Sequence, residues 1–130
     1  MAHEAEVRDE LARLRARTAE VTAVVAASTD GLVLAADPPL PGAEGVAALT
    51  AAALGVGLRL AEATGSGTFR ELLIRGEHGY VATYAAGTAC VLTVLAGPRA
   101  NVGRMHMEAR RAGARVAELL DGTAVRLEDA

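Results

Sequence analysis

The chain of 130 residues contains no lysine, no tryptophan and a single cysteine, and aromatic residues make up only 2% of it. Without lysine there is no phosphate-binding loop that ends in Gly-Lys-Ser/Thr, and no enzyme that forms a Schiff base on its own side chain. The single cysteine, Cys90, excludes an internal disulfide. Because aromatics are so few, we expect a core of aliphatic side chains and alanine.

The composition otherwise fits one folded domain. Hydrophobic residues make up 52% of the chain and charged residues 22%, a balance that excludes intrinsic disorder. We expect a single domain over residues 4–121 and a flexible C-terminal tail over residues 122–130. The net charge of −3 disfavours nucleic acid as the main partner. Residues 1–17 are charged throughout and would make a poor export signal, so we expect a cytoplasmic protein that meets a membrane only through its partners.

Periodicity and turn signals predict three helices and five strands. Asp30-Gly31 between two apolar runs indicates a hairpin, and residues 37–42, with three of the four prolines, indicate a loop. This order predicts an α/β (α+β) fold, a three-layer α-β-α sandwich with the topology α-β-β-α-β-β-β-α. The predicted helices span residues 4–18, 43–63 and 101–120, and the predicted strands span 21–27, 32–36, 68–75, 80–85 and 90–95.

The middle helix, residues 43–63, has more apolar surface than one sheet can cover. We predict that its second flank is covered by the same helix of a second copy, since Gly55 and Gly57 would let two backbones approach closely. Cover by the chain's own loops is one alternative. A membrane span is another, but the uncharged run from Gly45 to Gly57 has only thirteen residues where a span needs about twenty. The first flank holds Val46, Leu49, Ala53, Val56 and Leu60, and the second holds Ala47, Ala51, Leu54, Leu58 and Ala61.

No residue pattern indicates catalysis, a cofactor or a metal. Cys90 lies in an apolar strand and is predicted to be a buried structural thiol. The three histidines, His3, His78 and His106, lack the cysteine or acidic spacing of a metal site. Residues 65–68, Gly-Ser-Gly-Thr, precede a strand instead of opening a helix, which favours a turn over a phosphate site.

The last helix is amphipathic, with one apolar stripe and one charged face. Such a face is typical of solvent exposure, and an anionic partner surface is the alternative. Asn101 is its predicted N-cap. The charged face carries Arg104, Glu108, Arg111, Arg115 and Glu118, and Arg110 lies beside it.

Four stretches of the chain together resemble the roadblock/dynein light chain family. They are residues 24–35, residues 69–75, residues 91–96, and residues 101–104 with 108–112. The resemblance covers residues 5–120 and looks closest to the bacterial branch found beside small Ras-like GTPases, including actinobacterial conservon clusters.

The resemblance implies an antiparallel sheet of order 2-1-5-4-3, in a roadblock/profilin-like arrangement with the middle helix on one face and the terminal helices on the other. It also implies a homodimer in which the third strands pair edge to edge and the middle helices lie side by side. An unpaired third strand would otherwise invite aggregation. The expected interface residues are Ala51, Leu54, Leu58, Phe69, Leu72 and Ile74.

The resemblance further implies a protein that is not an enzyme and that binds a small Ras-like GTPase. Such a protein either stimulates hydrolysis without supplying an arginine finger or serves as a scaffold, with a kinase-like sensor complex as a further partner. Gly55, Arg59 and Glu62, beside the paired helices, are the candidate partner contacts. A small-ligand sensor and a purely structural assembly subunit are the alternative functions.

Overall fold

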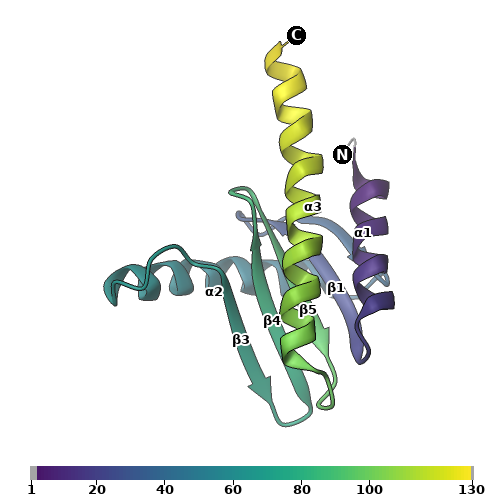
Figure 1. Ribbon diagram of the computed structural model, residues 1–130, viewed down its shortest axis with the longest axis vertical. Helices are drawn as coiled ribbons and strands as arrows, with labels where there is room; N and C mark the ends of the chain where they lie inside the picture. Colours follow the sequence, from purple (N-terminus) through teal and green to yellow (C-terminus); the bar gives the residue numbers. More distant parts are fainter. Residues whose placement is uncertain (1–2, 130) are drawn as a thin grey trace.

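A computed structural model describes residues 3–129, and the side chains up to Asp121 (Figure 1). In this part of the chain three helices and five strands follow one another in the predicted order. They are α1 (Glu4–Arg17), β1 (Val21–Ser28), β2 (Val33–Asp37), α2 (Ala43–Ala63), β3 (Glu71–Gly76), β4 (Gly79–Ala86), β5 (Cys90–Ala96) and α3 (Val102–Asp129).

Local sequence signals explain where these elements begin and turn. Asn101 caps α3 as predicted, because its side-chain oxygen accepts a hydrogen bond of 3.0 Å from the backbone N–H of Arg104. Between β1 and β2 the chain reverses at Gly31, whose φ of +92° is a conformation that favours glycine.

The five strands form one antiparallel sheet of order β2-β1-β5-β4-β3, which confirms the predicted fold. The central strand is β5, where Leu92 lies opposite Ala26 of β1 and Tyr84 of β4. The two edge strands are β2 and β3. Within residues 3–129, β3 pairs only with β4.

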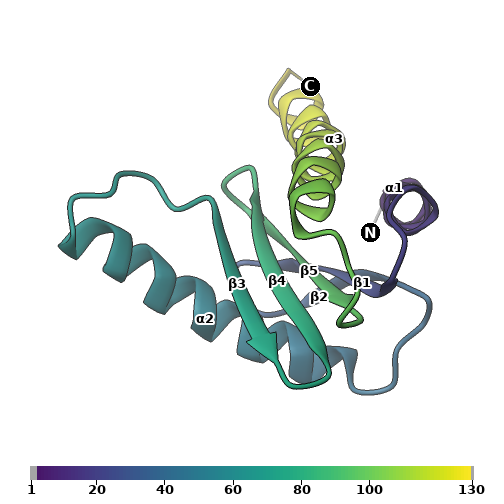
Figure 2. The same ribbon diagram turned by 60° about the horizontal axis from the view of Figure 1, so that its bottom comes forward.

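Helices cover both faces of the sheet: α1 and α3 lie on one face and α2 on the other (Figure 2). The larger core lies under α1 and α3, around Leu11, Tyr84, Leu92 and Met105. The cluster on the α2 side is much smaller and consists of Ala27, Ala47 and Val91 with Val33 packed against it. α2 therefore buries little of its own apolar surface.

Two expectations about the helices require correction. The helix α3 does not end at Leu120 but continues through Asp121 and Gly122 to Asp129. A glycine costs a helix only about 1 kcal/mol relative to alanine, so it permits an end without imposing one. Glu108 does not face solvent but is 6% exposed, because α1 packs along that side of α3. The backbone of the predicted flexible tail, residues 122–130, belongs to α3 as far as Asp129. The side chains of these residues, and the whole of Ala130, lie outside the described part, so the flexibility of the tail stays a prediction.

Candidate functional site

α2 packs on the sheet through one narrow face. Thr50 lies at the centre of this face, and its hydroxyl shares a hydrogen bond of 2.7 Å with the hydroxyl of Thr93 on β5. Both threonines are buried, so this bond lies between the two layers. The residues of α2 that are buried in this way are Ala43, Ala47, Thr50, Leu54 and Gly57.

The two apolar flanks of α2 are buried differently from the prediction, although Leu58 of the second flank, a predicted interface residue, is 47% exposed. Leu54, expected at a dimer interface, is 7% exposed and packs on the chain's own sheet. Ala51 lies against the turn between β1 and β2, since a Cβ added at Gly31 would be 3.5 Å from its Cβ. The chain's own loop thus covers part of the second flank. The more exposed flank is the first one, with Leu49 74%, Val56 65% and Leu60 62% exposed.

By length and composition alone, α2 is long and apolar enough to cross a membrane. One such helix is weak support for a span, because helices of ordinary domain layers meet the same criteria. The buried contact between Thr50 and Thr93 shows that α2 forms a layer of this domain. What remains unexplained is its exposed apolar flank.

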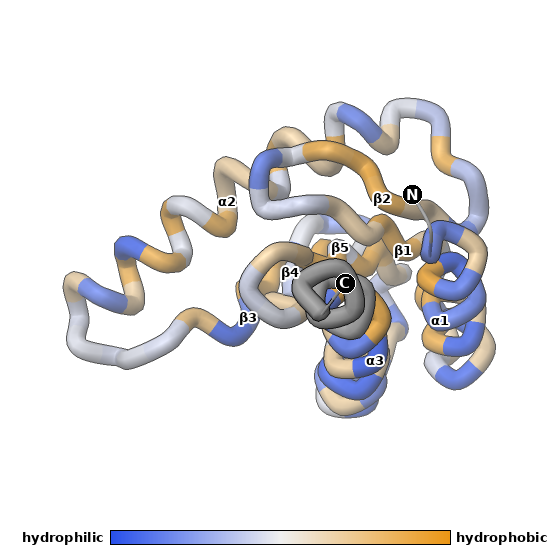
Figure 3. Tube along the Cα trace, turned by 90° about the horizontal axis from the view of Figure 1, so that it is seen from above, coloured by the Kyte–Doolittle hydropathy of each residue, from blue (hydrophilic) through white to orange (hydrophobic). Residues whose placement is uncertain are grey.

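The C-terminal end of α2 projects beyond β3, and the connection back to the sheet runs beside it (Figures 1 and 3). Phe69 was expected in the edge strand, but β3 begins only at Glu71. The ring of Phe69 packs against Gly57 on α2 instead and is 8% exposed. Phe69 therefore anchors this connection within its own chain.

β3 presents its outer edge beside the exposed flank of α2. Leu60 of α2 and Leu72 of β3 line the same hollow, which has a volume of about 430 Å³. Ile74, two residues further along the strand, is 48% exposed. We use the name α2–β3 surface for the set of Leu49, Val56, Leu60, Leu72 and Ile74. The predicted interface residues Leu72 and Ile74 belong to it, whereas Leu54 and Phe69 do not.

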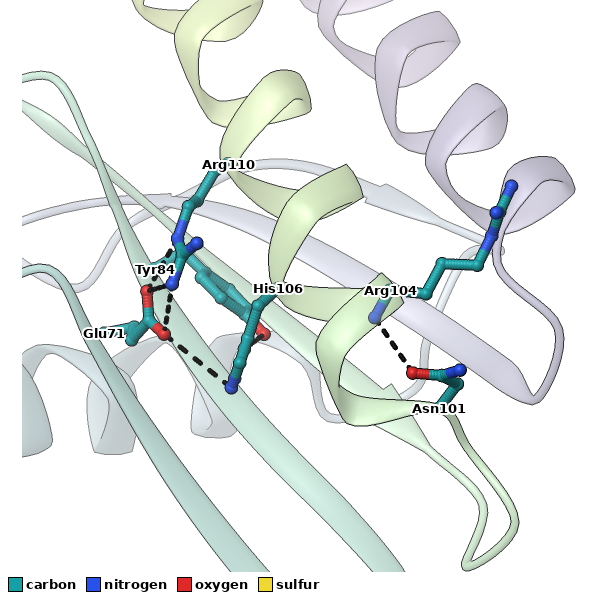
Figure 4. A network of polar contacts seen from close by, with 6 residues as sticks. All are labelled: Glu71, Tyr84, Asn101, Arg104, His106 and Arg110. Carbon is teal, nitrogen blue, oxygen red and sulfur yellow. Dashed lines mark hydrogen bonds and ion pairs between the residues drawn. The ribbon is translucent and has the colours of Figure 1, made fainter.

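On the other face of β3 a polar network ties the edge strand to α3 (Figure 4). Arg110 donates two hydrogen bonds to the carboxylate of Glu71, from Nε at 2.9 Å and from Nη2 at 2.8 Å. His106 Nδ1 shares a hydrogen bond with the hydroxyl of Tyr84, and its Nε2 lies 3.7 Å from Glu71. Sequence analysis missed this network, because its members come from three elements that no local pattern connects.

Burial and charge shift the protonation of two groups in the sheet. Burial, reinforced by the negative charge of Glu71, raises the pKa of the Tyr84 hydroxyl well above its usual range. Burial also raises the pKa of the Cys90 thiol from 9.0 to about 11. Cys90 is 1% exposed and protonated at neutral pH, as expected of a structural thiol and not of a nucleophile.

The part of the chain from α1 through β5, residues 7–96, matches the Roadblock/LC7 domain family. The chain belongs to this family. The match ends at the last residue of β5, before α3 begins.

Known proteins resemble this Roadblock/LC7 domain in sequence and in structure. It is 38% identical over 90 residues to the uncharacterized protein MJ1340 of Methanocaldococcus jannaschii, covering 67% of this chain and 76% of that protein. The crystal structure of a Roadblock/LC7 domain from Streptomyces avermitilis is 25% identical, covers 87% of this chain and 96% of its own, and superposes with a TM-score of 0.82. The gliding protein MglB of Thermus thermophilus has the same fold, with 21% identity, coverage of 94% and 93%, and a TM-score of 0.84. Another MglB structure, of a tetrameric arrangement, gives a TM-score of 0.85 at 21% identity.

In this Roadblock/LC7 domain the three predicted partner-contact residues, Gly55, Arg59 and Glu62, are all exposed. Their spacing of four and three residues places them on one side of α2, next to Leu58, which is 47% exposed. The structure thus brings them together as one polar strip on α2, separate from the α2–β3 surface.

Proposed function

We propose that this protein is a homodimeric, non-enzymatic regulator or scaffold of a small Ras-like GTPase, in a bacterial signalling complex of the actinobacterial conservon type. The observation that carries the proposal is the α2–β3 surface, which joins an unpaired strand edge to an exposed apolar helix flank. A stable soluble domain seldom leaves such a combination open to water.

A second copy of the chain fits this surface on physical grounds. A two-fold axis beside β3 would let the two edge strands satisfy each other's free backbone groups. The same axis would bring the two α2 helices together along the flank of Leu49, Val56 and Leu60. Because this flank carries no charged side chain, its burial leaves no unpaired charge.

The polar strip of Gly55, Arg59 and Glu62 would then lie along the outside of the paired helices, where it supplies charged and small residues for a partner. The sequence resemblance to GTPase-associated roadblock proteins supports a Ras-like GTPase as that partner, and membership of the family agrees with it. A kinase-like sensor would belong to the same complex. The protein would use this same strip whether it acts as a scaffold or as a stimulator of hydrolysis, and the two roles would differ only in the rate at which the bound GTPase hydrolyses GTP.

The dimer is tested by gel filtration with light scattering. The wild-type chain of 13.3 kDa should elute with twice that mass. Val56→Glu should give a monomer, because it places a charge in the centre of the proposed contact. Met107→Glu introduces the same charge at a residue of α3 that is 41% exposed, and it should stay dimeric. A wild-type protein that stays monomeric at high concentration would overturn the dimer.

The partner is tested with the purified Ras-like GTPase encoded nearest to this protein's gene. Calorimetry in the GDP and GTP-analogue states should show binding in at least one state, and Arg59→Ala should weaken it. Turnover measured with and without the protein distinguishes a stimulator from a scaffold. No binding in either state would refute the proposed function while leaving the dimer intact.

A further inference from the structure

The two helices on the other face of the sheet, α1 and α3, run antiparallel and are joined by polar contacts. Arg104 Nε donates a hydrogen bond of 3.0 Å to the backbone oxygen of Arg17, at the end of α1. Further along, Arg115 Nη1 lies 3.6 Å from Glu10 Oε2. The C-terminal end of α1 therefore lies beside the N-terminal end of α3, as Figure 1 also shows.

Two carboxylates are buried in the seam between these helices, and arginines surround both. The Glu10 residue is 9% exposed and Glu108 is 6% exposed. Glu10 accepts a hydrogen bond of 2.6 Å from Arg13 Nη1. We use the name arginine cluster for the four arginines that pair with these two carboxylates: Arg13, Arg104, Arg111 and Arg115.

The cluster presents more positive charge than the seam neutralises. Four guanidinium groups face two carboxylates, and the arginine side chains are 45% to 60% exposed whereas both carboxylates lie beneath them. Arg104 Nη2 and Arg111 Nη1 lie 4.0 Å and 3.9 Å from Glu108, which is beyond hydrogen-bond distance. Their outer N–H donors are therefore available to a carboxylate from outside.

Charge is also separated along this helical layer. Among the side chains described up to Asp121, the exposed acidic residues of α1 and α3 gather toward the opposite end, at the start of α1 and beyond the middle of α3, and the one exposed arginine at the start of α1, Arg8, is paired there with Glu4. This separation decides which kind of anionic partner fits. A broad anionic surface, such as a membrane, would contact both ends of the layer formed by α1 and α3, whereas a narrow anionic segment could contact the basic end alone. The acidic residues are Glu4, Glu6, Asp9, Glu118 and Asp121.

We propose that the arginine cluster is a docking site for an acidic segment of another protein. A narrow segment that carries several carboxylates can lie along Arg104, Arg111 and Arg115 without meeting the acidic end. An anionic membrane surface would be repelled by that end and by the net charge of −3. The cluster lies on the opposite face of the sheet from α2, so it leaves the proposed GTPase site and dimer surface free.

The binding test uses the full chain and a fluorescein-labelled peptide of alternating glutamate and serine, followed by fluorescence anisotropy at low ionic strength. The wild-type protein should bind this peptide, should release it as salt is added, and should not bind the matching glutamine–serine peptide. The double variant Arg104→Glu/Arg111→Glu should weaken binding about tenfold or more.

The matched control is Arg75→Glu/Arg99→Glu, which changes the net charge equally at two exposed arginines that lie outside α1, outside α3 and outside the proposed GTPase contacts. It should leave peptide binding within about twofold of wild type. Circular dichroism and light scattering should show that both double variants keep the fold and oligomeric state of the wild type, which makes the result independent of the proposed dimer. Arg104→Gln/Arg111→Gln, which puts no new negative charge beside Glu108, should weaken peptide binding in the same direction and replaces the charge reversal if that variant unfolds. The proposal is overturned if the peptide does not bind, if both double variants weaken it equally, or if vesicles containing phosphatidylserine bind through the cluster instead.

Discussion

The ring of Phe69 occupies the space beside Gly57 on the face of α2 that points to the sheet. A Cβ added at Gly57 would lie 2.7 Å from Cε2 of this ring, closer than real Cβ atoms approach, and 3.0 Å from Cδ2. Only glycine permits this contact, which holds the connection between α2 and β3 against the helix. The absence of a side chain at Gly57 thus allows Phe69 to hold the segment that leads into the edge strand β3.

Gly57→Ala should therefore destabilise the fold. The added methyl group improves helix propensity by about 1 kcal/mol, but overpacking against a buried aromatic ring costs typically about 1–3 kcal/mol. We expect a net loss in the free energy of unfolding, measured by urea denaturation at a fixed protein concentration.

Gly55→Ala is the matched control, because nothing lies within 4 Å of a Cβ added there. It should raise the free energy of unfolding by about 0.5–1 kcal/mol through helix propensity alone. Equal effects of the two alanine substitutions would show that the Phe69 contact does not constrain α2.

The sequence predicted the existence of the surplus apolar surface on α2 but not which flank would carry it. Periodicity gives the width of an apolar arc, and both flanks of α2 are apolar, so the rotation of the helix on the sheet was undetermined. The rotation is set by tertiary contacts, namely the pairing of Thr50 with Thr93 and the packing of Gly31 against Ala51. The strand order and the cap at Asn101 were predictable, because each follows from a local signal or from the family resemblance.

The same limit explains the buried glutamates. Glu10 and Glu108 lie on the charged sides of their own helices, and a single-helix pattern assigns such positions to solvent. Packing of α1 along α3 buries both of them. The burial of these two glutamates depends on contact between two helices that are far apart in the sequence, so the pattern of either helix alone does not predict it.

The hydrogen bond between Thr50 and Thr93 should show strong coupling in a double-mutant cycle. Thr50→Val leaves the buried hydroxyl of Thr93 without this partner and should cost about 1–2 kcal/mol of unfolding free energy. Thr50→Val/Thr93→Val removes both hydroxyls at nearly constant volume and should cost less than the sum of the two single changes. Simple additivity of the two losses in urea denaturation would mean that the pair does not act as a unit.

The bidentate contact between Arg110 and Glu71 should stabilise the edge strand modestly. Arg110→Ala removes two charge-assisted hydrogen bonds, but the arginine is more than half exposed, so we expect a loss of about 0.5–1 kcal/mol. Arg110→Lys keeps the charge without the planar fork and should fall between alanine and wild type. Arg8→Ala removes an exposed pair with Glu4 within α1, and its loss should be about 0.5 kcal/mol or less. An Arg8→Ala loss as large as that of Arg110→Ala would argue against a special role for the bidentate pair.

The free energy of unfolding should fall as the pH rises above about 9, because the folded protein holds a proton on Cys90 that the unfolded chain releases. The pKa of this thiol is raised by burial from 9.0 to about 11, so the unfolded state loses its proton first in this window. Each such group contributes a slope of at most about 1.4 kcal/mol per pH unit. Tyr84, whose pKa is raised by burial and by Glu71, adds to the fall above its ordinary value of 10.0.

Cys90→Ala should flatten the pH dependence between pH 9 and 11, the interval between the two thiol values. Tyr84→Phe should flatten it only above the ordinary tyrosine value of 10.0. The readout is the slope and not the stability at neutral pH, since removal of a buried sulfur or hydroxyl lowers stability at every pH. Urea denaturation over a pH series gives this slope directly. If Cys90→Ala and wild type show the same slope, the thiol is not held protonated by the fold, and another group causes the alkaline loss.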